Sequence, residues 1–378
     1  MLRDFFIEDR LERFRTSAFC NLGESGIRNQ NLSELSSYLG LDLRELGGLS
    51  LADSPNSGRP DLREEIASLY PGASADQVLV TTGTGEALFL AFSLLLEKGD
   101  MLSLFWPAFQ ALYEVPLFRG ARLNPVSLLD RMETGEFGFG EKNLRNLFEE
   151  KPKLVVLNHP HNPSGMSTTR TDREVLQKLL QDFQETWVLF DEHYRFLDGD
   201  SELGWTGFGL SERSLVTGSV TKCFGVMGLR IGWLVGPKDF IAKARSMKDY
   251  LTHTVSPISE FLTLALLRKR NAMQASIRKN LKTNITLFSG SVSDLAGIDF
   301  FRAPEGGIVG FPKLDPRLSS GSYADLLWNQ AGIFVLPGSD FETEGYIRVG
   351  FGETPERFRD GLDRWSAIGS ETIARLYK

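Results

Sequence analysis

The residues of this chain that could do chemistry lie in loops that follow short apolar segments. After Gln77–Thr81 come Gly83, Thr84 and Gly85, at the start of a helical pattern. Free backbone N–H groups and the helix dipole favour a phosphate at such a point. An ordinary turn between a strand and a helix would have the same residues, so this motif needs support from others.

Two further loops carry polar groups after apolar segments. Asn158–Gly165 contains two Asn-x-Pro-like turns and predicts a rigid loop, although Asn, Pro and Gly are also ordinary turn residues. Asp191 directly follows the apolar run Trp187–Phe190, and Tyr194 comes three residues later. A carboxylate at the end of a buried strand requires a cationic partner, unless it caps a helix.

A lysine follows a fourth apolar segment. Lys222 lies just after Leu215–Ser219, in a glycine-rich stretch that reaches Gly232 and contains Arg230. An apolar environment favours the neutral amine, which can form a Schiff base with an aldehyde. A solvated loop lysine is the alternative for Lys222 taken alone.

The elements between these loops determine whether they meet. From residue 61 to 235, apolar strand-like segments alternate with helical patterns, which predicts an α/β fold with a mostly parallel sheet covered on both faces. Loops at the carboxyl ends of such strands come together. A helical run over about 240–288 and the short strands GIVGFP, IFVLP and YIRVGF follow. We expect a large domain over 46–250, and a smaller α+β domain of 251–378 joined by the N-terminal segment 1–45.

Composition excludes several classes of protein. Lys and Arg number 42 and Asp and Glu 49, giving a net charge of −7 with no basic block, which argues against nucleic-acid binding. Two cysteines, four histidines without a metal-ligand spacing and no long apolar run predict no disulfide scaffold, no metal site and no membrane span. The charged N-terminus lacks a secretory signal, so we expect a cytoplasmic protein.

Together, the phosphate-type turn, the Asn, the Asp with its Tyr, and the Lys with its following Arg resemble the fold-type I aminotransferase family of pyridoxal-phosphate enzymes. The resemblance extends from Gly58-Arg59-Pro60-Asp61-Leu62-Arg63 to Arg348-Val349-Gly350-Phe351. It implies an aminotransferase-like large domain and pyridoxal 5′-phosphate as cofactor. It also implies a homodimer with shared active sites and a small amino-acid substrate.

The resemblance also implies a role for each matched residue. Lys222 would hold the cofactor and carry the substrate α-proton, Asp191 would pair with the pyridine nitrogen, and Arg348 would bind the substrate carboxylate. The other implied cofactor contacts are Asn162 and Tyr194 on the phenolic oxygen, Phe109 stacked on the ring, and Gly83, Thr84, Gly85, Ser219 and Arg230 around the phosphate.

One position departs from the family. Many members have a Tyr two residues before the Pro of the segment matching Ser54–Gly58, where it reaches the partner subunit's phosphate; here that residue is Asp53. A carboxylate near a phosphate is unfavourable unless a cation lies close by, and a basic substrate side chain would supply one. Asp53 capping a turn and facing away is an equal alternative.

Four segments resemble a smaller group, the enzymes that cyclise hydroxylated arginines to cyclic guanidine amino acids of the capreomycidine or enduracididine type. They are Cys20–Arg28, the Asp53 segment, Asn158–Gly165 and Lys248–Pro257. We therefore expect a cyclodehydratase that removes the α-proton of a β- or γ-hydroxyarginine, releases water and closes a ring by guanidine attack. Tyr194 departs from this group, which leaves the ring size open. Candidate acids around the guanidinium are Glu8, Asp9, Asp53 and, by preference, Glu24, although Glu8 and Asp9 fit a solvated helix face equally well. His161 and His193 are candidate proton donors or, alternatively, hydrogen-bond partners within their loops.

Two other functions remain. An aminotransferase, which moves an amino group from an L-amino acid to a 2-oxo acid, would use the same cofactor residues. A regulator that has kept the fold for effector sensing is disfavoured, because every cofactor position is filled and no DNA-binding segment is present.

Overall fold

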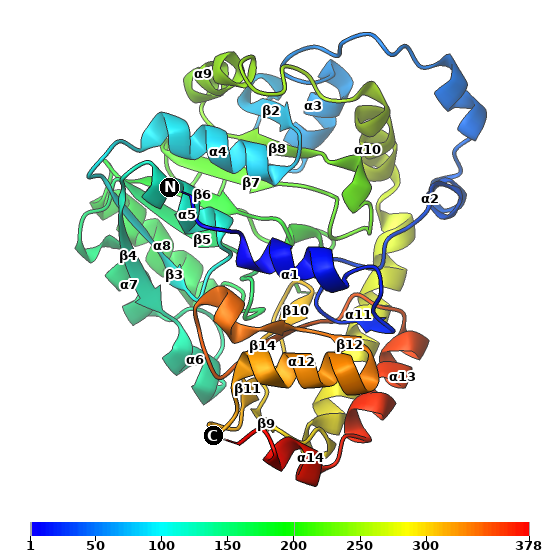
Figure 1. Ribbon diagram of the computed structural model, residues 1–378. Coiled ribbons are helices and arrows are strands. Elements are labelled where there is room, and N and C mark those ends of the chain that lie inside the picture. Colours follow the sequence, from blue (N-terminus) through cyan, green and yellow to red (C-terminus); the bar gives the residue numbers. More distant parts are fainter. Residues whose placement is uncertain (1, 200, 378) are drawn as a thin grey trace.

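A seven-stranded mixed sheet forms the centre of the large lobe (Figure 1). The computed structural model describes residues 2–199 and 201–377. The strand order is β2-β8-β7-β6-β5-β3-β4, and only β8 runs antiparallel to its neighbours. The strands are β2 (Val78–Thr81), β3 (Met101–Trp106), β4 (Arg122–Ser127), β5 (Leu154–Asn158), β6 (Trp187–Asp191), β7 (Ser214–Gly218) and β8 (Gly232–Val235).

Helices cover both faces of this sheet because the strand side chains alternate between two apolar clusters. Val155 and Leu157 of β5 pack on the face of α3, α7 and α8, while Leu154 and Val156 pack on the face of α4, α5 and α9. The helices of this lobe are α3 (Pro60–Ser68), α4 (Thr84–Leu95), α5 (Ala111–Phe118), α6 (Leu129–Thr134), α7 (Glu141–Glu149), α8 (Arg170–Asp182), α9 (Lys238–Lys248) and α10 (Pro257–Lys269).

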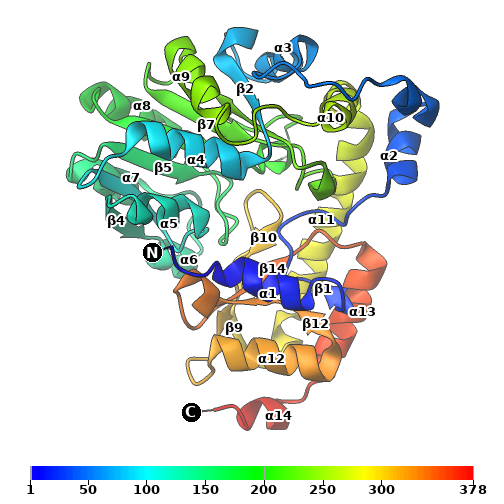
Figure 2. The ribbon, with the colours of Figure 1, turned by 45° about the horizontal axis from the view of Figure 1, so that its top comes forward.

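The small lobe has short strands and four helices. Its elements are α11 (Asn271–Ser291), β9 (Ile298–Phe300), β10 (Val309–Gly310), β11 (Lys313–Leu314), α12 (Ser320–Ala331), β12 (Ile333–Phe334), β13 (Leu336–Pro337), β14 (Ile347–Gly350), α13 (Pro355–Ser366) and α14 (Ser370–Ala374). The long helix α11 passes beside both lobes in Figures 1 and 2.

The N-terminal segment joins the two lobes. It contains α1 (Phe6–Phe14), β1 (Cys20–Asn21) and α2 (Leu32–Leu39), and β1 pairs in parallel with β12 of the small lobe. Figures 1 and 2 show α1 lying between the large sheet and the small lobe. This arrangement places α1 beside the edge where β5, β6 and β7 end.

The predicted α/β fold is confirmed, with two local differences. The helical run over 240–288 consists of α9, α10 and α11, separated by a loop that ends at Pro257 and by a break at Arg270. Strand β4 was not predicted, because its side chains are mostly exposed or half-buried and form no apolar run. The division between residues 250 and 251 stays a prediction, since α10 follows that point and packs against α3. Within the described residues, no helix is long and apolar enough to cross a membrane.

Candidate active site

The loops after β2, β5, β6 and β7 meet the N-terminal segment and β14 around a cavity of about 660 Å³. It is lined by most of the predicted site residues: Glu8, Glu24, Gly83, Thr84, Gly85, Phe109, Asn162, Asp191, His193, Tyr194, Lys222, Arg230 and Arg348. A second cavity, of about 520 Å³, lies between α2 and α11 and contains none of these residues. The first cavity is therefore the candidate active site.

A buried carboxylate lies at the bottom of this site. Asp191 ends β6, and its two oxygens accept hydrogen bonds from Thr217 Oγ1 at 2.8 Å and Asn158 Nδ2 at 3.0 Å. Burial raises the pKa of Asp191 above its ordinary value, against those hydrogen bonds and the charge of Lys222. Among the described residues no basic side chain forms an ion pair with it, so a cationic group in the cavity would complete the site. The protonated pyridine nitrogen of pyridoxal phosphate is such a group.

Sequence analysis missed the two partners of Asp191. Asn158 ends β5 and Thr217 lies in β7, and both are directly opposite Asp191 in the register of the sheet. The strand ends alone could have identified Asn158, because neighbouring parallel strands place their last residues side by side. Asn158 also accepts a hydrogen bond from the backbone N–H of Asn162 at 2.6 Å, and so shapes the loop that follows.

The amine of Lys222 lies inside the cavity. Its Nζ donates a hydrogen bond to Ser25 Oγ at 2.7 Å, and it lies 5.6 Å from the ring centre of Phe109 and 5.8 Å from that of Tyr194. The hydroxyl of Tyr194 is buried and has no hydrogen-bond partner in the described part of the chain. An oxygen atom of a bound cofactor would supply that partner.

Arg348 reaches the cavity from the small lobe. It is 1% exposed, and its two Nη atoms donate to Asn162 Oδ1 at 3.0 Å and to the carbonyl oxygen of Gly23 at 2.5 Å. Its Nε is buried without a hydrogen-bond partner, and burial lowers its pKa. A buried guanidinium held by neutral acceptors favours an anion, and a carboxylate matches its planar fork.

An anion also fits the opposite end of the cavity. Gly83, with φ of 80°, is the residue before α4, and the start of this helix, with its free backbone N–H groups, lines the cavity. A Cβ atom on Gly83 would come within 3.2 Å of Arg230 Nη2, so the guanidinium lies beside the helix start. These donors are suitable for a phosphate.

Ser219 is not among the residues that line the cavity, and its contact with a phosphate stays a prediction. Ser219 is 1% exposed, and its hydroxyl donates to the carbonyl oxygen of Ile231 at 2.7 Å. Thr221, two residues later, lines the cavity instead. Both residues follow β7, and only the path of the turn decides which hydroxyl faces inward.

The two candidate histidines differ in position. His161 lies outside the cavity lining and bonds Ser164 Oγ through Nδ1 at 2.8 Å, which agrees with a hydrogen bond within its loop, and burial lowers its pKa to about 3. His193 lines the cavity, with Nδ1 3.3 Å from Thr84 Oγ1. Burial and the charges of Lys222 and Arg230 lower its pKa, which holds the ring neutral.

Two of the four candidate acids line the cavity and share one basic partner. Glu24 Oε1 lies 2.7 Å from Arg15 Nε, and Glu8 Oε2 lies 3.4 Å from Arg15 Nη2. Asp9 lines a different depression on the outer side of α1. Asp53 is exposed and accepts a hydrogen bond from Thr254 Oγ1 at 3.3 Å, so within one chain it does not reach the cavity.

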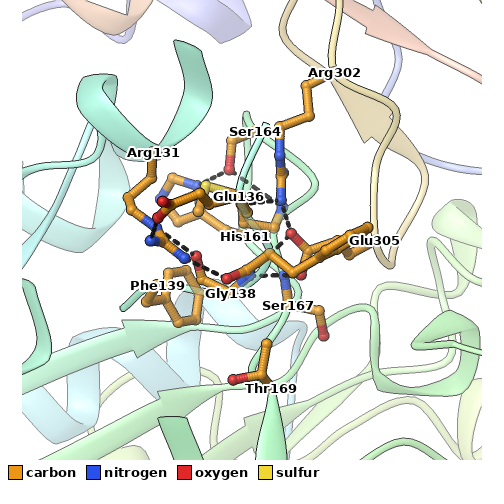
Figure 3. A network of polar contacts seen from close by, with 12 residues as sticks. Arg131, Glu136, Gly138, Phe139, His161, Ser164, Ser167, Thr169, Arg302 and Glu305 are labelled. Carbon is orange, nitrogen blue, oxygen red and sulfur yellow. Dashed lines mark hydrogen bonds and ion pairs between the residues drawn. The ribbon is translucent and has the colours of Figure 1, made fainter. Parts of the chain in front are cut away.

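A polar network behind the cavity connects the two lobes (Figure 3). Glu305 of the small lobe accepts hydrogen bonds from the backbone N–H groups of Gly138, at 3.1 Å, and Ser167, at 3.3 Å, and pairs with Arg302. Ser167 follows the loop that contains Asn162, so this network holds that loop against the small lobe. Among the described residues, no group of His, Cys, Asp or Glu side chains could hold a metal ion.

Comparison with known proteins agrees with this geometry. Residues 47–364 match the family described as Aminotransferase class I and II. The chain belongs to this family. The resemblance predicted from the motifs is confirmed, and so is pyridoxal 5′-phosphate as the cofactor of this enzyme. The buried Asp191, the partnerless Tyr194 hydroxyl and the start of α4 fit its ring nitrogen, phenolic oxygen and phosphate.

Individual proteins similar to this aminotransferase-family chain include a capreomycidine synthase, a transaminase and a crystal structure described as a cyclase. Capreomycidine synthase of Streptomyces vinaceus is 29% identical over 367 residues, which cover 97% of this chain and 92% of that protein. The arginine–pyruvate transaminase AruH of Pseudomonas aeruginosa is 27% identical over 328 residues, covering 84% and 82%. The crystal structure of the pyridoxal-phosphate-dependent cyclase OrfR has a TM-score of 0.89 at 23% identity, covers 98% of this chain and 97% of its own, and shares the fold.

Proposed function

We propose that the protein is a cyclodehydratase that converts a β- or γ-hydroxylated L-arginine to a cyclic guanidine amino acid of the capreomycidine or enduracididine type. The observation that carries this proposal is the similarity to capreomycidine synthase over 97% of the chain. The residues that line the cavity support it, because they offer a partner to each end of such a substrate.

The two ends of the substrate would bind the small lobe and the N-terminal segment. Arg348 binds the α-carboxylate through its two Nη atoms, and the loop of Asn162 fixes the direction of that guanidinium. Glu8 and Glu24 bind the guanidinium at the far end. These two carboxylates already contact a guanidinium in this chain, that of Arg15, so their spacing suits such a group.

In the proposed reaction, Lys222 acts at the substrate α-carbon. Pyridoxal phosphate, when bound, withdraws electrons from that carbon and makes its proton acidic. Lys222 removes the proton and holds it as an ammonium group. A β-hydroxyl then leaves with one proton as water, the guanidine nitrogen forms the new bond to the β-carbon and loses a proton, and the α-carbon regains one. A γ-hydroxyl leaves only after a second proton has been removed from the β-carbon; the guanidine nitrogen then bonds the γ-carbon and loses a proton, and the α- and β-carbons each regain one. Asp191 holds the positive charge on the ring nitrogen throughout.

An aminotransferase is the second candidate. The similarity to the arginine–pyruvate transaminase supports it, because that enzyme's name gives arginine and pyruvate as its substrates. The residues proposed for the cofactor and the carboxylate would act in the same way. The two functions differ only in the fate of the hydroxyl and of the amino group.

A mass measurement separates the two candidates. The holoenzyme is incubated with 3-hydroxy- or 4-hydroxy-L-arginine, with and without pyruvate, and the mass of the product is measured by mass spectrometry. The cyclase proposal expects the loss of one water with all four nitrogens retained. Turnover that needs pyruvate and transfers nitrogen to it would refute the cyclase and support the aminotransferase.

We also propose a homodimer that shares its active sites. The loop after α9 exposes 91% of Tyr250, and the segment before α3 exposes 78% of Leu51. The two segments contact one another through Asn56 Nδ2 and Asp249 Oδ1 at 2.8 Å, so they form one surface that includes Asp53. Light scattering at several concentrations tests this state.

We propose the cytoplasm as the compartment, and Cys20 and Cys223 are free and buried.

A further inference from the structure

The segment Cys20–Gln30, which we name the N-terminal strap, is held on both sides by backbone hydrogen bonds. On the small-lobe side, Leu22 receives a hydrogen bond from the N–H of Gly350 at 2.7 Å. On the other side, the N–H of Ile27 donates to the carbonyl oxygen of Lys222 at 2.8 Å. The strap therefore has a defined position relative to the backbone of the catalytic lysine.

The strap lies close against that lysine. A Cβ atom on Gly26 would come within 3.1 Å of Met227 Sδ and within contact distance, 3.5 Å, of Lys222 Cα, so the backbones of the strap and the lysine lie close together. Ser25, the preceding residue, is 3% exposed and also lines the cavity. Its Oγ accepts the hydrogen bond from Lys222 Nζ at 2.7 Å.

We propose that Ser25 is a positioning residue for the amine of Lys222. The lysine side chain is long and flexible, and an amine that is not bonded to the cofactor can take many directions. The hydrogen bond to Ser25 selects one direction. It leaves the lone pair of Lys222 free to face the cofactor or the substrate α-carbon.

The chemistry of the amine makes this role compatible with both halves of a proton transfer. A neutral amine and an ammonium group each have an N–H to donate, so the hydrogen bond to Ser25 Oγ survives when Lys222 gains or loses a proton. The bond therefore keeps the nitrogen in one place while the proton moves. This role does not depend on whether the enzyme is a cyclase or an aminotransferase.

The test compares Ser25→Ala with Ser25→Thr, which keeps the hydroxyl, and with Ser17→Ala, an exposed serine just before the strap. Two rates are measured. The first is the rate at which apoenzyme binds pyridoxal phosphate covalently, followed by absorbance. The second is the exchange of the L-arginine α-proton for deuterium, followed by NMR, together with the Kd for L-arginine. L-Arginine has no hydroxyl to lose, so this exchange is independent of cyclisation, which is assayed separately with hydroxyarginine.

Ser25→Ala should slow both rates about tenfold and change the Kd by less than about twofold, because only the direction of the amine is lost. Ser25→Thr should restore most of both rates, and Ser17→Ala should match the wild-type protein. Unchanged rates in Ser25→Ala would overturn the inference. So would a parallel loss of rates, L-arginine affinity and melting temperature in both Ser25 variants, which would show a purely structural role.

Discussion

Replacing Arg348 with lysine keeps the positive charge and removes the planar fork. In the folded chain the guanidinium spans two acceptors, Asn162 Oδ1 at 3.0 Å and the carbonyl oxygen of Gly23 at 2.5 Å. A lysine has a single nitrogen on its stem and cannot reach both while it also faces a substrate carboxylate. The variant should therefore bind that carboxylate through one hydrogen bond in place of two.

The size of the effect follows from burial. Arg348 is 1% exposed, so water cannot replace the lost contact. A hydrogen bond to a charged group contributes about 1.5–3 kcal/mol, which corresponds to a roughly 10- to 150-fold weaker Kd. The loss should fall entirely on ligands that carry an α-carboxylate.

Two ligands isolate this contribution. L-Arginine and agmatine share the amine and the guanidinium, and only L-arginine has the carboxylate. Their binding to the holoenzyme is measured from the change in cofactor absorbance. Arg348→Lys should raise the Kd of L-arginine by about 10- to 150-fold and the Kd of agmatine by less than about threefold.

A matched control tests whether any buried arginine would behave in this way. Arg195 is 5% exposed and donates from Nε to the carbonyl oxygen of Gly204 at 2.8 Å, outside the cavity lining. Arg195→Lys should leave the ratio of the two Kd values unchanged. Equal weakening of both ligands by Arg348→Lys would refute the assignment of Arg348 to the carboxylate and indicate a structural role.

Three further predictions concern single carboxylates. Asp191→Asn should lower the affinity for pyridoxal phosphate by at least about 100-fold in an absorbance titration, because the buried partner of the ring nitrogen is lost. An unchanged affinity would contradict this role of Asp191. Glu24→Gln should raise KM for hydroxyarginine about tenfold with little change in kcat; steady-state kinetics measures this, and an unchanged KM excludes Glu24 from guanidinium binding. Burial raises the pKa of Asp340 from 3.8 to about 6, although Arg10 Nε lies 3.0 Å away. The folded state therefore binds more protons than the unfolded state between these values, and stability falls as pH rises through 6. Relative to Asp340→Asn, the wild-type free energy of unfolding should fall by up to about 3 kcal/mol between pH 4 and pH 7 in urea titrations, and a constant difference would contradict this.

The order of the motifs and their resemblance to a known family were enough to predict the main catalytic set. Asp191 follows the apolar run Trp187–Phe190 and Lys222 follows the partly apolar Leu215–Ser219. Such segments form a buried parallel sheet whose carboxyl ends lie together. For that reason both residues could be placed in one site without any coordinates. Arg348 lies too far along the chain for the sheet pattern to place it, and its place in the site was predicted from the order of the motifs.

Contacts that depend on register or on turn geometry could not be predicted in this way. Thr217 bonds Asp191 because β6 and β7 pair in one register, and a shift by one residue would turn its side chain to the other face. Thr221 lines the cavity in place of Ser219 because of the path of the chain after β7. Local composition indicates neither the contact of Thr217 nor the position of Thr221.

The sequence by itself determined the α/β class and the residues at the strand ends, because these depend on local periodicity and residue type, and its ordered motifs determined the cofactor through their resemblance to a known family. Only the tertiary structure decided that Ser25 contacts Lys222 across 197 positions of chain and that Glu8 and Glu24 share Arg15. These contacts require the N-terminal segment to pack between two lobes. Long-range packing of this kind depends on the shapes of both surfaces, which local patterns do not specify.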